Sequence, residues 1–394
     1  MTKKAELEKL AAQIQNEVAS YDESDPTSWI GIQNAMGQLR RATEPPNMFI
    51  MKQRFHTVEN ISVVAAIHMG LLQLLAENKD KSFKVSELAE KTGWHDSLIC
   101  RVMRMMGAIA FVDEVGYEEY TANANTSTLC MPGNLGGTQL TNNMTFRLGD
   151  KIGEFLDQNK PCDISGGKTP SAYEFAFGET TWETFTKNSA WKKGFDDSMS
   201  IRNKTISIPW YKKYPVKQHF SLTEMKKVIV DIGGNQGIDL QRFADDFPDM
   251  DCELVLQDLP ETIKGIPAGT LGPKVRPVVY DFFTEQNIKG ADIYYLKSVL
   301  HDWDDISSVE ILSNTAKAMK PQSRLLINEI VLLDTNESLL KCDMDMLMLY
   351  LCNGMERTKT QWEELLAKVE PALKLVNVWS AQGDQQSVIE AQLA

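Results

Sequence analysis

The stretch VIVDIGGNQGIDLQRF, residues 228–243, contains the pattern that decides the fold. Its apolar run 228–232 predicts a strand, and the segment after the last glycine predicts a helix. Gly233, Gly234 and Gly237 allow the connecting turn to bend sharply and to bring its backbone close to a ligand. A strand, a glycine turn and a helix in this order indicate a site for a nucleoside-type cofactor.

A carboxylate follows the next predicted strand, Glu253–Gln257. This residue, Asp258, lies about 20 residues after the turn, where it can accept hydrogen bonds from the two hydroxyls of a ribose. That pattern fits a dinucleotide and S-adenosylmethionine equally. The turn, however, lacks the Gly-x-Gly-x-x-Gly spacing that seats a pyrophosphate, and Asp231 beside it would repel phosphate. Both features favour S-adenosylmethionine, whose amino-acid end carries an ammonium group.

Short apolar runs alternate with helical segments through the second half of the chain. This alternation predicts a parallel sheet with helices on both faces. Beyond the third strand, Asp281 and Phe282 offer a carboxylate and an aromatic face to an adenine ring. The expected strands are Val228–Ile232, Glu253–Gln257, Val275–Tyr280, Ala291–Leu296 and Arg324–Leu332, with helices near Asp239–Phe247, Leu259–Lys264 and Ile306–Lys320.

The stretch LKSVLHDWDD, residues 296–305, places a histidine directly after a predicted strand. Open α/β sheets bind their ligands at this carboxyl edge, although a lone histidine is more often a structural residue. Here two carboxylates are available to pair with His301: Glu329 in the next strand and Glu356 in the segment GMERT. A glutamate within an apolar strand needs a partner, because an unpaired buried carboxylate is costly. Flanking carboxylates would orient the imidazole and raise its basicity.

The first half of the chain reads as mainly helical. Helices are expected over residues 4–20 and up to about 42, and a buried helix over 62–78. Two more helices and a hairpin over 111–123 complete the pattern of a winged helix. Its candidate recognition helix carries only Arg101 and Arg104 among mostly apolar residues, which disfavours binding to a DNA groove.

The composition limits the classes of protein further. A length of 394 residues favours two domains, which we place at residues 1–160 and 161–394. The formal net charge of −13 disfavours binding to nucleic acid or to an anionic membrane. The six cysteines are scattered, and no run of about 20 apolar residues occurs, so we expect a cytoplasmic protein without a membrane span.

These motifs, in this order, resemble the small-molecule O-methyltransferases of the plant caffeic-acid type, in the branch found in fungal natural-product pathways. The resemblance runs from about Val64 to Lys368 and includes the segments AYEFAFGETTWE and GMERTKTQWEELL. It implies an α/β fold: a Rossmann-like class I methyltransferase domain after a mainly helical, winged-helix-like domain that forms a homodimer. It also implies a small-molecule substrate of aromatic or polyketide-like character.

The resemblance assigns roles to individual residues. His301 stands at the position of the general base, with Glu329 and Glu356 as supporting carboxylates. The reaction needs no metal, and the sequence shows no clustered set of metal ligands. The positions that hold S-adenosylmethionine are Gly233, Gly234, Asp258, Asp281, Phe282 and Lys297. The expected acceptor pocket includes Met199, Lys341 and Met348, although the aromatic-rich segment around Met199 also fits simple core packing.

Two positions depart from the family pattern. The third glycine of the turn is replaced by Asn235, and we expect the turn to survive because asparagine tolerates a left-handed backbone. Lys341 precedes the Met-rich helix 343–351 and is either a solvent-facing charge or a cation that polarises a substrate carbonyl.

The alternative activity on the same scaffold is a pericyclase or cyclase that binds S-adenosylmethionine without transferring its methyl group. A non-catalytic binding protein is a third hypothesis. Retention of His301, Glu329 and Glu356 favours methyl transfer to a phenolic or enolic hydroxyl.

Overall fold

The computed structural model describes residues 2–25, 27–162, 169–205, 207–219 and 226–394. The chain divides into two compact units, Met1–Asn142 and Asn143–Ala394. Their boundary lies within helix α8 (Pro132–Gln158), whereas the boundary expected from the sequence lies just beyond the end of this helix.

The first unit is mainly helical and contains a small antiparallel sheet. Its strands β1 (Ser82–Lys84), β2 (Val112–Gly116) and β3 (Glu119–Ala122) are arranged in the order β1-β3-β2. Pairing of β2 with β3 confirms the expected hairpin. The helices are α1 (Lys3–Ala19), α2 (Trp29–Thr43), α3 (Pro46–His68), α4 (Leu71–Glu77), α5 (Val85–Thr92), α6 (Asp96–Ala108), α7 (Ala124–Leu129) and the start of α8.

The single helix expected over residues 62–78 is wrong. The chain breaks at Gly70, which adopts φ +74° between α3 and α4. Among the described residues no single helix is both long and apolar enough to cross a bilayer, and α3 and α4 meet that length and composition only together, across a bend of 61°.

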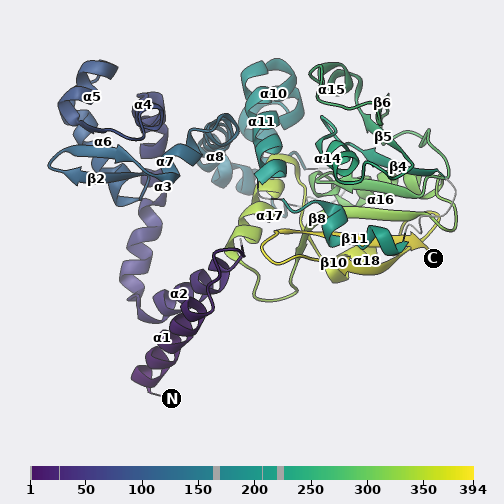
Figure 1. Ribbon diagram of the computed structural model, residues 1–394, viewed down its shortest axis with the longest axis horizontal. Helices are drawn as coiled ribbons and strands as arrows, with labels where there is room; N and C mark the ends of the chain where they lie inside the picture. Colours follow the sequence, from purple (N-terminus) through teal and green to yellow (C-terminus); the bar gives the residue numbers. More distant parts are fainter. Residues whose placement is uncertain (1, 26, 163–168, 206, 220–225) are drawn as a thin grey trace. The chain divides into compact units, whose positions relative to one another are not determined.

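The second unit is an α/β domain built around one mixed sheet (Figure 1). Its strands are β4 (Lys227–Ile232), β5 (Cys252–Asp258), β6 (Val275–Val279), β7 (Ile293–Lys297), β8 (Arg324–Leu332), β9 (Arg357–Thr358), β10 (Leu373–Trp379) and β11 (Gln386–Leu393). Its helices are α9 (Ala172–Phe177), α10 (Thr181–Lys187), α11 (Ser189–Thr205), α12 (Trp210–Lys213), α13 (Val216–His219), α14 (Ile238–Asp246), α15 (Pro260–Gly265), α16 (Asp305–Ala316), α17 (Leu339–Cys352) and α18 (Lys359–Ala367), and a short 3₁₀ turn η2 spans Leu300–Asp302.

The strands follow the order β10-β11-β8-β7-β4-β5-β6, and β9 pairs with β8. Strands β4 to β8 run parallel, as the alternation of strands and helices predicts. Strands β10 and β11 add an antiparallel edge that the sequence analysis did not include. The order reverses at β4, since β5 lies on one side and β7 on the other. Ligands of open α/β sheets bind at such a switch point.

Helices cover both faces of this sheet. Successive side chains of a strand point to opposite faces, so each buried strand contributes to two cores. Val230 of β4 packs in one core with Ile311 of α16. Its neighbour Ile229 packs in the other core with Phe243 of α14. These cores hold the carboxyl ends of β4, β7 and β8 in place.

Candidate active site

The glycine turn leaves β4 at the switch point of the sheet. Gly233 and Gly237 adopt φ +71° and +74°, in the left-handed region. Gly234 is required for space, because an added Cβ would lie 2.5 Å from Asp231 Oδ2 and 2.5 Å from Leu256 Cδ1. The side of the turn that faces Asp231 and Leu256 is therefore too closely packed for any side chain at position 234. Because glycines have no side chain, a ligand can also approach the backbone of the turn closely.

Asn235 fulfils the expectation that it tolerates the turn, since its φ is +51°. Its backbone N–H donates to Asp258 Oδ2 over 2.9 Å. The second oxygen of this carboxylate accepts from the N–H of Leu259, at 2.8 Å. The turn after β4 and the end of β5 are thus joined through Asp258.

A group of buried charges lies at the base of the turn. Asp231 is almost fully buried, and its Oδ1 has no hydrogen-bond partner within the described part of the chain. Burial, with the nearby Asp239 adding to it, raises the pKa of Asp231 well above its usual range. Asp239 Oδ2 pairs with Lys297 Nζ at 2.9 Å and accepts from the Tyr295 hydroxyl at 3.0 Å. Its Oδ1 is also buried and unpartnered among the described residues.

The glycine turn and the buried charges beneath it, Asp231, Asp239 and Lys297, form a cradle, and these observations test whether it fits S-adenosylmethionine. Asp239 pairs with Lys297, and Asp231 and Asp239 each retain a buried oxygen that has no hydrogen-bond partner among the described residues. Such a set of acceptor oxygens suits an ammonium group, which donates hydrogen bonds, and opposes a phosphate. The residues present therefore fit the amino-acid end of S-adenosylmethionine. Lys297, expected to contact the cofactor, is placed by the structure in an ion pair with Asp239.

The residues after β6 lie beside the glycine turn. Asp281 is exposed, and its Oδ1 accepts from the N–H of Phe283 at 3.0 Å. The ring of Phe282 meets Trp303 edge to face, with centroids 5.9 Å apart. A Cβ added at Gly233 would lie 3.9 Å from Phe282, so this ring borders the turn.

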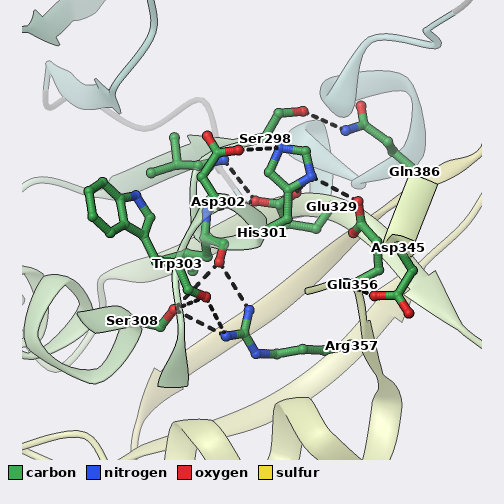
Figure 2. A network of polar contacts seen from close by, with 12 residues as sticks. Ser298, His301, Asp302, Trp303, Ser308, Glu329, Asp345, Glu356, Arg357 and Gln386 are labelled. Atoms are coloured by element: carbon green, nitrogen blue, oxygen red, sulfur yellow. Dashed lines mark hydrogen bonds and ion pairs between the residues drawn. The ribbon is translucent and has the colours of Figure 1, made fainter. Parts of the chain in front are cut away.

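His301 lies at the centre of a buried polar network (Figure 2). It belongs to the 3₁₀ turn that follows β7, while Glu329 belongs to the neighbouring strand β8. Short strand β9 pairs with the end of β8, which brings the preceding residue, Glu356, to the same place. His301 Nδ1 lies 2.8 Å from Glu356 Oε1 and 3.8 Å from Glu329 Oε2, and His301 Nε2 lies 3.7 Å from Asp302 Oδ1.

The two glutamates have different partners. Glu356 bonds the imidazole directly. Glu329 Oε1 accepts the N–H groups of Val299 and Leu300, at 2.9 and 3.0 Å, and so anchors the turn that carries His301.

The carboxylates control the charge of the imidazole. Burial lowers the pKa of His301, but the negative charges of Glu329, Asp302 and Glu356 outweigh it and raise that pKa to about 10. Burial raises the pKa of Glu329, and the nearby imidazole partly offsets this effect. Without a ligand, the network therefore favours the positively charged imidazolium form of His301 at neutral pH.

The same three side chains form a compact set of possible ligands. One ligating atom from each of His301, Glu329 and Glu356 lies within 4.8 Å of the others, a spacing that a metal ion could span. The sequence shows no cluster of metal ligands, and it is the fold that brings these three residues together from positions up to 55 apart. Reaction without a metal remains a prediction.

The residues expected in the acceptor pocket lie on two helices. Met348 of α17 is buried, and Met199 of α11 is partly buried. Lys341 Nζ donates to the carbonyl of Val331 at 2.9 Å. Helix α17 also reaches the network of His301, since Asp345 Oδ1 accepts the N–H of Glu356 at 2.8 Å.

Sequence reasoning did not identify several residues of this region. Asp239 and Tyr295 lie at the base of the glycine turn, and Gly354 and Arg357 flank Glu356 on either side. In the sequence, only the location of the polar residues among them, within or next to segments expected to be buried, could have drawn attention to them. The contacts that give them a role join segments far apart in the chain.

Comparisons with known proteins agree with this geometry. A family model described as an O-methyltransferase domain matches residues 161–369. The O-methyltransferase ATR12 of Stachybotrys chlorohalonatus is 36% identical over 226 residues, which is 57% of this chain and 56% of that protein. Demethylsterigmatocystin 6-O-methyltransferase of Aspergillus parasiticus is 28% identical over 330 residues, 82% of this chain and 83% of the relative.

Two solved structures share the fold along the full length. OxaC, crystallised with SAH and oxaline, superposes with a TM-score of 0.83 at 25% identity and full coverage of both chains. A pericyclic reaction enzyme has a TM-score of 0.87 at 23% identity, covering 99% of this chain and 100% of its own. Both likenesses show the fold of this chain.

Proposed function

This chain belongs to the O-methyltransferase family, and on that premise we propose that it methylates a phenolic or enolic hydroxyl of a natural-product small molecule, with His301 as the general base. The chain is an S-adenosylmethionine-dependent enzyme. The observation that carries the proposal is the buried contact of 2.8 Å between His301 Nδ1 and Glu356. It fixes the ring and directs the opposite nitrogen, Nε2, away from that carboxylate.

The chain's residues have two tasks in this mechanism. We assign Gly233, Gly234, Asp258, Asp281, Phe282 and Lys297 to holding S-adenosylmethionine, which supplies a methyl group already activated on its sulfonium. Asp231 and Asp239 support this assignment, because their unpartnered oxygens suit its ammonium group. Alignment of the reacting groups can contribute several kcal/mol, up to about 7–11.

The second task is proton transfer. His301 acts as a base from its neutral form, whose share rises with pH because the carboxylates favour the imidazolium. In this neutral form the one ring proton is on Nδ1, bonded to Glu356, so Nε2 can accept the proton of the acceptor hydroxyl. The resulting imidazolium is stabilised by Glu356 and Glu329, whose charges already favour that form. General-base catalysis of this kind contributes roughly 10²–10⁴-fold. We assign Met199, Lys341 and Met348 to the acceptor side of the site.

We further propose that the protein works as a homodimer in the cytoplasm. Its first unit exposes apolar side chains along α2 and α3 that a second copy would cover, namely Trp29, Met36, Met48, Phe49, Ile50, Met51, Phe55, Val58 and Ile61. All six cysteines are free thiols, in keeping with a reducing compartment. Light scattering of the purified protein should give twice the mass of 44.4 kDa, and a monomer at micromolar concentration would contradict the dimer.

The activity is tested with S-adenosylmethionine labelled on its methyl carbon and a panel of phenolic and enolic acceptors. We expect label in the product and one SAH formed for each product molecule. A converted substrate without label or SAH would contradict methyl transfer and favour the pericyclase alternative.

A further inference from the structure

Arg357 is the most deeply buried cation beside the proposed base. It is the first residue of β9 and directly follows Glu356, and its guanidinium is fully buried. An arginine is seldom buried unless its donors are satisfied. Its hydrogen bonds therefore indicate what it does.

The guanidinium binds the chain on both sides of His301. Its Nη1 donates to the carbonyl of Leu300 at 3.0 Å, and its Nη2 donates to the carbonyl of Trp303 at 2.9 Å. The remaining bonds go to Ser308 Oγ at 3.2 Å and, from Nε, to Asp305 Oδ1 at 3.0 Å. Figure 2 shows Arg357 directed toward Trp303 and Ser308 under the turn that carries His301.

This turn depends on outside partners for its shape. It is a single 3₁₀ turn, Leu300–Asp302, closed at its end by the bond from the N–H of Trp303 to the carbonyl of Leu300 at 3.2 Å. Arg357 binds this same carbonyl and the carbonyl of Trp303, the residue that follows the turn. Glu329 holds the other end by accepting the N–H groups of Val299 and Leu300. The turn is thus fixed from both ends.

The position of Arg357 in the chain links this fixation to the carboxylate partner of His301. Glu356 and Arg357 are consecutive, so one short backbone segment carries both the carboxylate at 2.8 Å from Nδ1 and the guanidinium under the turn. A shift of the turn relative to Arg357 would change the distance between His301 and Glu356 by a similar amount.

We propose that Arg357 is a positioning residue that holds the backbone of the turn so that the imidazole of His301 stays in contact with Glu356 and keeps its orientation. The proposal rests on the proposed function, in which His301 is the base. Arg357 acts through the backbone of residues 300–303 and touches no reacting atom.

The test compares Arg357→Lys with Arg324→Lys. The first keeps the charge but cannot donate to two carbonyls at once in a fixed fork. The second removes the fork of an arginine bonded to Glu390 and to the carbonyls of Gln322 and Ser323, at the opposite end of β8 from Glu329. For each variant we would measure kcat, the KM for the acceptor, the dissociation constant of SAH and the pH dependence of kcat/KM.

For Arg357→Lys we expect kcat, compared at the alkaline plateau where the base is neutral in both proteins, to fall on the order of 100-fold, the effect of a 1 Å misplacement. The SAH dissociation constant should stay within about twofold, since the cradle lies on other strands. The pKa at which kcat/KM increases with pH, which we assign to His301, should move down toward 6.5, the ordinary value of histidine, because contact with Glu356 loosens. Arg324→Lys should leave kcat and the pH profile unchanged. An Arg357→Lys variant with normal kcat and an unshifted profile would overturn the proposal.

A milder variant keeps the test decisive if Arg357→Lys does not fold. Ser308 contacts the guanidinium and lies 3.5 and 3.4 Å from the same two carbonyls, of Leu300 and Trp303. Ser308→Ala should therefore shift the pH profile in the same direction by a smaller amount, and an unchanged profile would refute the role. His301→Ala, measured alongside, separates the two claims: if it stays active, the proposed base is wrong, whatever Arg357 does.

Discussion

Gly354 provides a sharp test of how the proposed base is held. It lies two residues before Glu356, against the turn that carries His301. A Cβ added at this position would lie 2.0 Å from the carbonyl oxygen of His301 and 3.1 Å from the backbone of Asp302. Since its φ is outside the left-handed region, the requirement for glycine here is one of space alone.

The size of the effect follows from this distance. Real Cβ atoms essentially never approach another heavy atom closer than 3.0 Å, so Gly354→Ala must push the two backbones apart by about 1 Å. The N–H of Met355, which donates to the same carbonyl at 2.9 Å, would be displaced with it. Overpacking of this kind costs about 1–3 kcal/mol of stability. A misplacement of 1 Å at a catalytic group lowers the rate roughly 100-fold.

The assay is single-turnover methyl transfer, together with calorimetric binding of SAH and a thermal unfolding scan. We expect Gly354→Ala to lower the rate roughly 100-fold and to leave SAH binding within about twofold. Gly265→Ala is the matched control, because Gly265 ends α15 and an added Cβ meets nothing within 4 Å. A folded Gly354→Ala protein with a rate within about threefold of wild type would refute the link between this contact and the base.

Three other predictions follow from the site. Burial lowers the pKa of His301, but the surrounding carboxylates raise it to about 10, so kcat/KM should still increase with pH well above pH 6.5, and an increase centred at pH 6.5 would contradict this. The charged imidazole also stabilises the fold; this stabilisation is complete below pH 6.5 and should be lost as the pH rises to about 10. Gly234→Ala should weaken SAH binding roughly tenfold or more in calorimetry, because its Cβ would lie 2.5 Å from Asp231, and unchanged affinity would argue against this cradle. Lys341→Met should raise the KM for the acceptor, in line with its place on the acceptor side, and leave kcat within about twofold, because its ammonium donates to the carbonyl of Val331. A large loss of kcat would instead favour a role of Lys341 on a substrate carbonyl.

Local patterns in the sequence predict much of the α/β domain. Strand β8 has the bounds expected from its mostly apolar sequence, Arg324–Leu332. Within the glycine turn, Gly233, Asn235 and Gly237 have the left-handed backbone that their residue types allow. These features depend on neighbours in the chain, which spacing and residue type describe well.

Features that depend on distant contacts were not predictable in this way. Strand β11 is buried by its antiparallel pairing with β8, and nothing in the order of residues 386–393 indicates that partner. The break at Gly70 replaces an apparently continuous helix, since one glycine within an apolar pattern does not by itself show where a helix ends. Arg357 is recognisable only when the carbonyls of Leu300 and Trp303 lie within its reach.

The central claim is that His301 takes the proton of the acceptor hydroxyl. It is tested most directly by single-turnover transfer of the labelled methyl group in His301→Ala and in wild type, with SAH binding measured on both proteins. The account predicts a rate lower by roughly 10²–10⁴-fold and an SAH dissociation constant within about twofold of wild type. Methyl transfer by His301→Ala within about tenfold of the wild-type rate, with SAH still bound, would contradict it.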